Sequence, residues 1–331
     1  MKNVAKPTDP NEWLAAAGRV VLDSQYGINA TRIIRILSHK SKHIHFLDDQ
    51  GNPWILSAIA TEPGRIPFSL QFHLLECLQH SGWTYGHLPK RNTDGSYFCT
   101  ASGLNWVLKK FVDQQVSDKN SPGAISSAGQ ILADMHRAGT GCSPLSPDVE
   151  TGLTTFYWDS IRWASEISTI WDTIFDRSCL ASDEVYYLEK KVHEVASLLP
   201  YINEFVCKEI LFPTVTHQDY RPANFCFVKS QITQIWDWDI ARPDASFYDV
   251  AFASLQYGGR ECLFSDISLE RADYFIKEYS QRIGVKWCSE KADIMNWFMM
   301  VCILKRTLMN WHARDRVQLL RKIDEYKSQY F

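Results

Sequence analysis

Short apolar runs dominate the first third of the chain, and helical stripes of apolar residues dominate the rest. Five runs rich in β-branched and aromatic residues predict strands, at residues 31–37, 42–47, 53–60, 97–101 and 106–111. The stretch DDQGN at residues 48–52 has the composition of a hairpin turn between the second and third of them. Two further runs, 213–216 and 232–236, predict strands inside the helical part.

Helices are predicted wherever apolar residues recur every three or four positions. The clearest is an amphipathic helix that begins at Asp183 and that Pro200 should end, because proline removes a backbone donor. The other predicted helices span about residues 9–22, 67–79, 121–139, 155–175, 246–256, 268–282, 290–311 and 313–329. Strands first and helices later predict an α+β fold in two lobes, residues 1–106 and 107–331.

The composition mainly excludes other classes of protein, namely those that bind nucleic acid or span a membrane. Hydrophobic residues at 45% and charged residues at 22% are ordinary for a soluble globular protein. The net charge of −3 offers no basic surface of the kind that nucleic acid recruits. The longest apolar run, 297–304, is too short to span a membrane, and no signal peptide is visible. We therefore expect no nucleic-acid partner and no membrane partner.

The nine cysteines are scattered, odd in number and without a C-x-x-C pair. This pattern favours reduced thiols in the cytoplasm over a disulfide framework or a zinc site. We therefore expect a cytoplasmic protein, as a monomer or a homodimer.

Polar residues cluster where the two central strands end. They are His217, Asp219, Arg221 and Asn224 after the first strand, and Asp237 and Asp239 after the second. Polar groups at the ends of buried strands are costly unless something needs them there. A nucleotide triphosphate with Mg²⁺ would need them, because hard cations take carboxylate and amide oxygens. Phosphoryl transfer also needs a residue that orients the attacking hydroxyl.

The spacing of these residues is specific. His217 and Asp219 are one residue apart, and four residues separate Asp219 from Asn224, which fits the H-x-D…N catalytic loop of protein kinases. Together with the following IWDWD at 235–239, the loop resembles the aminoglycoside phosphotransferase and choline kinase superfamily, small-molecule kinases with a protein-kinase-like fold. The alternative is that Asp219 and Asp237 are turn and cap residues at strand ends.

The resemblance implies a role for each residue of the loop. Asp219 would be the catalytic base, Asn224 and Asp237 would hold Mg²⁺, and His217 would brace the loop. Arg221 stands two residues past Asp219, where protein kinases carry a lysine, and would offset charge on the transferred phosphate.

Three further positions match the family less specifically. Asp239 would either join the metal shell or anchor the loop; we favour the anchor. His136 ends an LADMH run that resembles an L-x-x-L-H pattern of the family, and alone it is better read as a structural histidine. The FYDVA stretch at 247–251 resembles the helix start that follows the metal-binding aspartate.

The N-terminal lobe departs from the family pattern. Kinases carry a lysine on the third strand, which pairs with a glutamate on the next helix. The aligned positions here are Ser57 and Gln71. Lys42 on the adjacent strand, with Lys40 as runner-up, is the candidate cation for the phosphates. The remaining candidate nucleotide contacts are Trp106, Val107 and Leu108 before the hinge between lobes, and Phe225 after the catalytic loop.

We therefore predict an ATP- and Mg²⁺-dependent phosphotransferase that acts on a hydroxyl of a small molecule. The alternatives are a pseudokinase or scaffold without the Lys–Glu pair, and a nucleotidyl transferase. A protein kinase is disfavoured because only about ten residues separate Asp237 from Tyr248, too few for an activation segment. The acceptor's identity stays open, and four aromatic residues are candidates to line its site: Trp163, Tyr257, Trp297 and Trp311.

Overall fold

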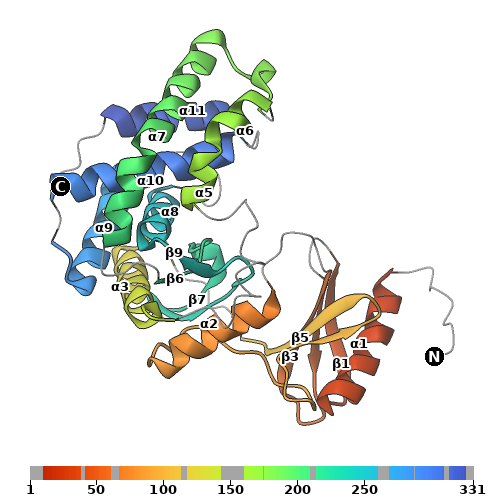
Figure 1. Cartoon of the computed structure of the whole chain (residues 1–331). Helices are drawn as coiled ribbons and strands as arrows, with labels where there is room; N and C mark the ends of the chain where they lie inside the picture. The colour runs from red at the N-terminus through yellow and green to blue at the C-terminus, as the bar shows by residue number, and fades with distance from the viewer. Residues whose placement is uncertain are drawn as a thin grey trace. The chain divides into compact units, whose positions relative to one another are not determined.

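The protein was analysed as a computed structural model. The structure describes residues 10–38, 42–60, 67–112, 118–142, 160–173, 175–208, 214–259, 268–286, 288–308 and 313–325. The chain divides into two compact units, which are coloured by residue number in Figure 1. The first unit comprises residues 1–68 and 87–114, and the second comprises residues 69–86 and 115–331. The first unit is therefore not one continuous segment of chain.

The first unit is an antiparallel sheet with one helix against it. Its elements are α1 (Pro10–Tyr26), β1 (Arg32–Ser38), β2 (Lys42–Leu47), β3 (Pro53–Ala60), β4 (Cys99–Ala101) and β5 (Leu104–Lys110). The strand order is β1-β2-β3-β5-β4. The helix packs on one face, where Ile44, Leu56 and Trp106 form a buried core with Leu14 of the helix. Gly18 permits this contact, because a Cβ there would collide with Ile44 Cδ1.

The hairpin predicted between β2 and β3 is present. Asp48 Oδ1 accepts hydrogen bonds from the backbone N–H of Gln50 (3.0 Å) and of Asn52 (2.7 Å). Its Oδ2 accepts from Trp54 Nε1 at 2.9 Å. Gly51 takes φ +79°, in the left-handed region that glycine tolerates. This turn fixes the register of the β2–β3 pair.

The second unit is mainly helical. Its described helices are α2 (Phe68–His80), α3 (Pro122–Gly139), α5 (Ser160–Ser165), α6 (Ile167–Thr173), α7 (Ser182–Lys208), α8 (Ser246–Gly258), α9 (Leu269–Ile283), α10 (Ser289–Leu308) and α11 (Ala313–Glu325). Every residue of α8 is buried, and α8 packs against both α9 and α10. Two short antiparallel sheets of two strands each carry the polar cluster. They are β6 (Thr214–Thr216) with β9 (Arg242–Asp244), and β7 (Phe225–Val228) with β8 (Gln231–Ile235).

The predicted α+β fold, with strands first and helices later, is confirmed. The predicted end of a helix at Pro200 is wrong, because α7 continues through that proline to Lys208. Within residues 160–173, the single predicted helix is two, α5 and α6. The short strands β7 and β9 were not predicted. No helix in the described ranges is long and apolar enough to cross a membrane.

One disulfide corrects the expectation of reduced thiols throughout. Cys77 of α2 is bonded to Cys142, which follows α3, with Cα atoms 6.0 Å apart. The two cysteines are 65 positions apart in sequence, so only the packing of α2 against its own unit brings them together. Five further cysteines are free: Cys99, Cys207, Cys226, Cys288 and Cys302.

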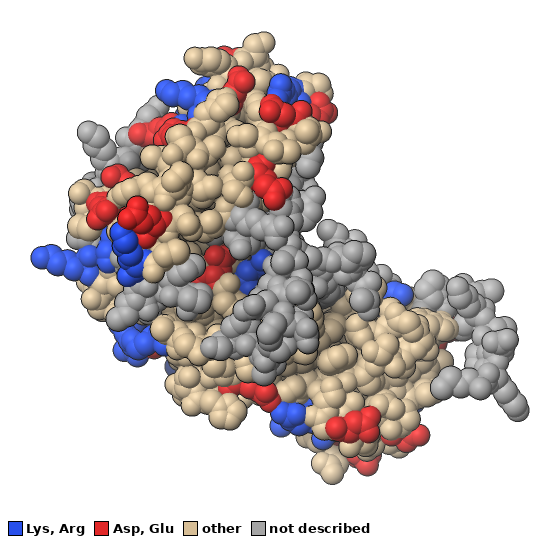
Figure 2. All heavy atoms as spheres, viewed as in Figure 1, with Lys and Arg blue, Asp and Glu red and all other residues tan. Residues whose placement is uncertain are grey.

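Acidic and basic side chains are interspersed over the described part of the face in Figure 2. This distribution agrees with the small net charge of −3. The described part of that face therefore shows no extended basic patch of the kind that binds a nucleic-acid backbone.

Candidate active site

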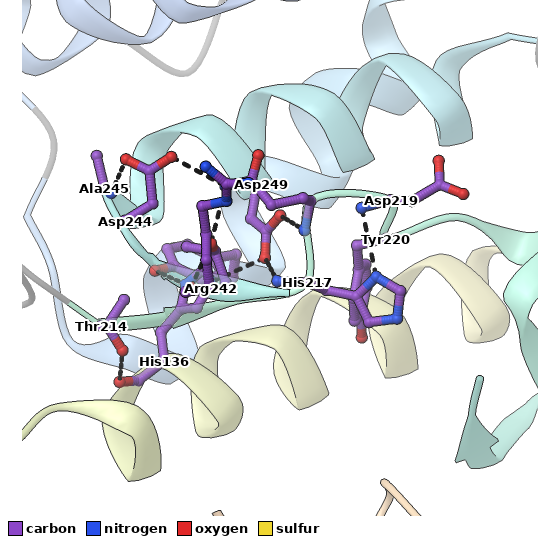
Figure 3. Close-up of polar contacts among 12 residues, drawn as sticks. His136, Thr214, His217, Asp219, Tyr220, Arg242, Asp244, Ala245 and Asp249 are labelled. Atoms are coloured by element: carbon purple, nitrogen blue, oxygen red, sulfur yellow. Dashed lines mark hydrogen bonds and ion pairs between the residues drawn. The ribbon is translucent and has the colours of Figure 1, made fainter. Parts of the chain in front are cut away.

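A buried carboxylate fixes the loop that follows β6. Asp249, in the first turn of α8, is fully buried. Its Oδ2 accepts the backbone N–H of His217 at 2.6 Å, and its Oδ1 accepts that of Gln218 at 2.7 Å. Gln218 takes φ +68° at this point, a conformation that costs free energy unless neighbours enforce it. Figure 3 shows Asp249 lying between the loop and the other labelled side chains.

His136, on α3, extends the buried hydrogen-bond network around Asp249. Its Nε2 lies 3.4 Å from Asp249 Oδ2, and its Nδ1 lies 2.9 Å from the hydroxyl of Tyr279 on α9. His136 has no exposed surface. The backbone carbonyl of His136 accepts from Thr214 Oγ1 on β6 at 2.6 Å (Figure 3). These contacts agree with the interpretation of His136 as a structural residue that joins α3, β6 and α8.

The ring of His217 connects the two strand ends. Its Nε2 lies 2.7 Å from the carbonyl oxygen of Trp236, and its Nδ1 lies 3.3 Å from the backbone nitrogen of Asp219. The amide of Asp219 donates to Nδ1, so the proton is on Nε2, which donates to Trp236. The ring of His217 therefore joins the end of β6 to the end of β8.

The Asp219 carboxylate is held by two residues of its own loop. Its Oδ2 accepts from Arg221 Nε at 2.8 Å and from Asn224 Nδ2 at 2.9 Å. The side chain keeps 14% of its surface exposed. Both contacts of Asn224 to Asp219 use Nδ2, so its amide oxygen, the atom that a hard cation prefers, is not used in them.

An arginine that the motif search missed also reaches Asp219. Arg306, near the end of α10, places Nη2 3.7 Å from Asp219 Oδ1, and its guanidinium lies over the ring of Phe252 on α8. Burial lowers the pKa of the neighbouring Lys305 to about 7. The only sequence signal was a Lys-Arg pair that ends an apolar helix, and such pairs are usually ordinary helix C-termini.

The proposed metal ligands lie at adjoining strand ends. The backbone N–H of Trp236, the residue before Asp237, donates to the carbonyl of Asn224 at 2.8 Å. Asp237 is exposed and takes φ +62°. The described residues contain no cluster of three His, Cys, Asp or Glu side chains. One amide and one carboxylate oxygen fit Mg²⁺, which often takes its other ligands from phosphate and water.

A hydrogen bond to the backbone of Asp239 brings Asp239 and Gln71 together. The backbone oxygen of the half-buried Asp239 accepts from Gln71 Nε2 at 3.2 Å. Gln71 belongs to α2 and is 2% exposed. The position aligned with the kinase glutamate therefore serves here to fasten α2 to the chain after β8.

The candidate nucleotide residues of the first unit divide between the two faces of its sheet. Trp106 and Leu108 belong to the core under α1, and Val107 lies on the opposite face with Ser57. Lys42 lies on the α1 face, with Nζ 5.5 Å from the centroid of the Trp13 ring. Ser57 is 5% exposed, and its Oγ lies 2.9 Å from Nδ1 of His43, a residue that sequence reasoning missed. Lys40 lies outside the described residues.

The aromatic candidates for lining the acceptor site are core residues. Trp163, Tyr257 and Trp297 are 2%, 0% and 0% exposed, so the prediction that they line a pocket is wrong. Phe225 is also fully buried, against Tyr220. These large aromatic side chains fill the interior of the second unit. Trp311 lies outside the described residues.

Comparison with known proteins identifies the fold. No protein-family model matches the chain, and no curated protein matches it in sequence. An amicoumacin kinase in complex with AMP-PNP, Ca²⁺ and Ami matches with a TM-score of 0.64 at 12% identity, covering 96% of this chain and 92% of that one. A Plasmodium vivax ethanolamine kinase has a TM-score of 0.60 at 13% identity, covering 97% and 93%.

A spectinomycin phosphotransferase in complex with ADP and spectinomycin has a TM-score of 0.59 at 12% identity, covering 96% of this chain and 95% of that chain. These similarities extend over both units, and they agree with the resemblance that the catalytic-loop motif carries. The chain therefore has the fold of the spectinomycin phosphotransferase, the amicoumacin kinase and the choline/ethanolamine kinases.

Proposed function

We propose that the protein transfers the γ-phosphate of ATP to a hydroxyl group of a small molecule in a Mg²⁺-dependent reaction. The observation that carries this proposal is the geometry around Asp219. Its carboxylate is partly exposed, held in place by Arg221 and Asn224, and mounted on a loop that the buried Asp249 fixes. Structural neighbours in complex with ADP and spectinomycin, or with AMP-PNP and Ami, support a nucleotide donor and a small acceptor.

In this proposal Asp219 accepts the proton of the acceptor hydroxyl and orients its oxygen toward the phosphate. Asn224 and Asp237 would hold Mg²⁺, which would neutralise negative charge on the phosphates of the nucleotide. Arg221 and Arg306 flank the same carboxylate, within 2.8 Å and 3.7 Å of its oxygens. They stabilise negative charge where the phosphate is transferred.

The direct test is incubation of the purified protein with Mg-ATP and a panel of small molecules that carry hydroxyl groups. The acceptor classes are aminoglycosides, amino alcohols, sugars and secondary metabolites. We expect one class to gain a single phosphate by mass spectrometry, with ADP formed in equal amount. A gain of AMP would instead identify a nucleotidyl transferase.

A second candidate is a nucleotide-binding scaffold without turnover. One observation favours it: the β3 position that carries a lysine in protein kinases is Ser57. The same panel separates the candidates, because a scaffold binds Mg-ATP and consumes none of it.

The two acidic residues after β8 should differ in their effect on metal binding. Asp237→Asn is expected to weaken Mg²⁺-dependent nucleotide binding about tenfold or more. Asp237 is exposed, and it directly follows Trp236, whose backbone is hydrogen-bonded to Asn224. Asp239→Asn should change it much less, since Asp239 anchors α2 through its backbone oxygen. Nucleotide titrations with and without Mg²⁺ decide the point. A larger effect of Asp239→Asn would move the metal site to that residue.

A further inference from the structure

We propose that the disulfide between Cys77 and Cys142 makes the activity depend on redox conditions, because it fastens the helix and loop that position Asp237. The proposal rests on the proposed function, in which Asp237 holds Mg²⁺. The residues that carry it all belong to the second unit, which includes α2 and the loop up to residue 86.

The loop after α2 is joined to the last residue of β8. The backbone N–H of Ile235 donates to the carbonyl of Tyr85 at 2.9 Å, and Gly86 forms a parallel β-bridge with Ile235. The carbonyl of Gly86 accepts from the side-chain amide of Gln79, near the end of α2, at 2.9 Å. Hydrogen bonds therefore connect α2, through this loop, to the strand that ends two residues before Asp237.

The ring of Trp238 lies between the loop after α2 and the proposed catalytic loop. Its centroid is 5.6 Å from that of Trp83 and 4.8 Å from that of His217, and Trp238 is 4% exposed. A Cβ at Gly86 would lie 3.2 Å from the Trp238 ring and would collide with Leu75 of α2. Close packing therefore transmits the position of α2 to the segment of chain that follows β8.

The backbone conformation of Asp237 depends on the residues around it. Asp237 takes φ +62°, in the left-handed region, which is unfavourable for a residue with a Cβ unless the surrounding structure holds it there. Two residues later, the backbone oxygen of Asp239 accepts from Gln71 Nε2 of α2 at 3.2 Å. A looser α2 should therefore lower the population of this conformation and weaken Mg²⁺ binding.

Two links join this segment to α3. Trp83 Nε1 donates to the carbonyl of Ile131 at 3.3 Å, and Cys77 is bonded to Cys142 just past the end of the helix. No helix in the described ranges makes extensive backbone contact with α2, whereas α3 and α9 pack along each other. The fully buried leucines of α2 are Leu70, Leu74 and Leu78. They keep α2 in place after reduction, so loss of the covalent link should loosen the helix without releasing it.

The exposure of the two cysteines indicates which sulfur a reductant attacks. Cys77 is half-buried, whereas Cys142 is 7% exposed. A thiolate of a dithiol reductant attacks Cys77 Sγ, the bond to Cys142 breaks, and Cys142 leaves as a thiolate that takes up a proton. The second thiol of the reductant then displaces Cys77 as a thiol. The reductant becomes a disulfide, and the protein gains two electrons and two protons.

The test compares the oxidised full-length protein with the same protein reduced by dithiothreitol. Reduction should weaken Mg-ATP binding about 3- to 30-fold, the range for coupling between residues of one network. Reoxidation should restore it. Amide hydrogen exchange of a peptide that covers residues 235–239 should be faster in the reduced protein. A double variant, Cys77→Ser with Cys142→Ser, should behave like the reduced wild type and should not respond to dithiothreitol.

Cys207→Ser is the matched control, because Cys207 is an exposed free cysteine on α7. It should respond to dithiothreitol like the wild type. All measurements are made well below the melting temperature of each form, so that a loss of global stability does not enter the comparison.

Three results would overturn the proposal. They are an unchanged Mg-ATP affinity with unchanged exchange at 235–239, an equal loss of nucleotide affinity with and without Mg²⁺, and a double serine variant that still responds to dithiothreitol. Hydrogen exchange is measured without nucleotide. If the wild type binds no nucleotide, the proposed function fails, while the exchange at 235–239 still tests whether the disulfide holds this segment.

Discussion

Replacement of Asp219 by asparagine is expected to lower kcat by about 10²- to 10⁴-fold, the range for removal of a general base. Mg-ATP binding should change by no more than a few-fold, because Asn224 and Asp237 remain. The asparagine side chain has the same size as that of Asp219, and its amide oxygen can still accept a hydrogen bond from Arg221 Nε. In the wild type this hydrogen bond is 2.8 Å long. Steady-state kinetics on the acceptor found in the panel, with nucleotide titration of the same variant, measures both effects.

Asp183→Asn is the control for this experiment. Asp183 also pairs with an arginine, Arg321, at 3.0 Å, but its side chain is 72% exposed and far along the chain from the loop. Its replacement should leave kcat unchanged. If Asp219→Asn kept more than about a tenth of wild-type turnover, Asp219 would not be the catalytic base, since a base contributes about 100-fold or more.

The second large effect concerns stability. Asp249→Ala should lower the free energy of unfolding of the second unit by about 3–5 kcal/mol, the cost of breaking a buried polar pair. The substitution leaves the backbone N–H groups of His217 and Gln218 without their acceptor, and His136 without its carboxylate neighbour. Urea unfolding followed by tryptophan fluorescence gives the change.

The comparison for Asp249 is Asp134→Ala. Asp134 accepts from Arg282 at 2.8 Å at the surface, where both side chains are partly exposed, so its loss should cost about 1 kcal/mol or less. A cost for Asp249→Ala as small as that of Asp134→Ala would contradict the role of Asp249 as the anchor of the loop. The folded fraction of Asp249→Ala should also lack turnover, because the geometry of the loop depends on the Asp249 carboxylate.

The grouping of the residues in the proposed catalytic loop could be predicted from sequence because it is local. His217, Asp219 and Asn224 lie within eight residues, and Asp219 contacts both of the others. Arg306 could not be predicted in this way, since it reaches Asp219 only through the packing of α10 on α8. The same holds for the disulfide, whose cysteines are 65 positions apart.

The placement of Lys42 is a different case, because the sequence did contain the signal. In KHIHFL, the buried residues Ile44 and Phe46 are two and four positions after Lys42. A period of two therefore puts Lys42 with them and puts His43 on the opposite face. The prediction of Lys42 rested on its charge, its place on the adjacent strand and the reach of its side chain, and it did not consider which face of the strand the residue occupies. The aromatic candidates for the acceptor site failed for a related reason: hydrophobicity alone does not separate a pocket wall from the interior.

The bond between Cys77 and Cys142 also has a consequence for how the protein responds to proteases. The disulfide closes a loop of chain that contains β4 and β5 of the first unit, although both cysteines belong to the second unit. A single cut anywhere between residues 78 and 141 therefore leaves two fragments that remain covalently joined. We expect such a nicked protein to migrate near full length on a denaturing gel without reductant and as two fragments with it. A Cys142→Ser variant should show both fragments in either case.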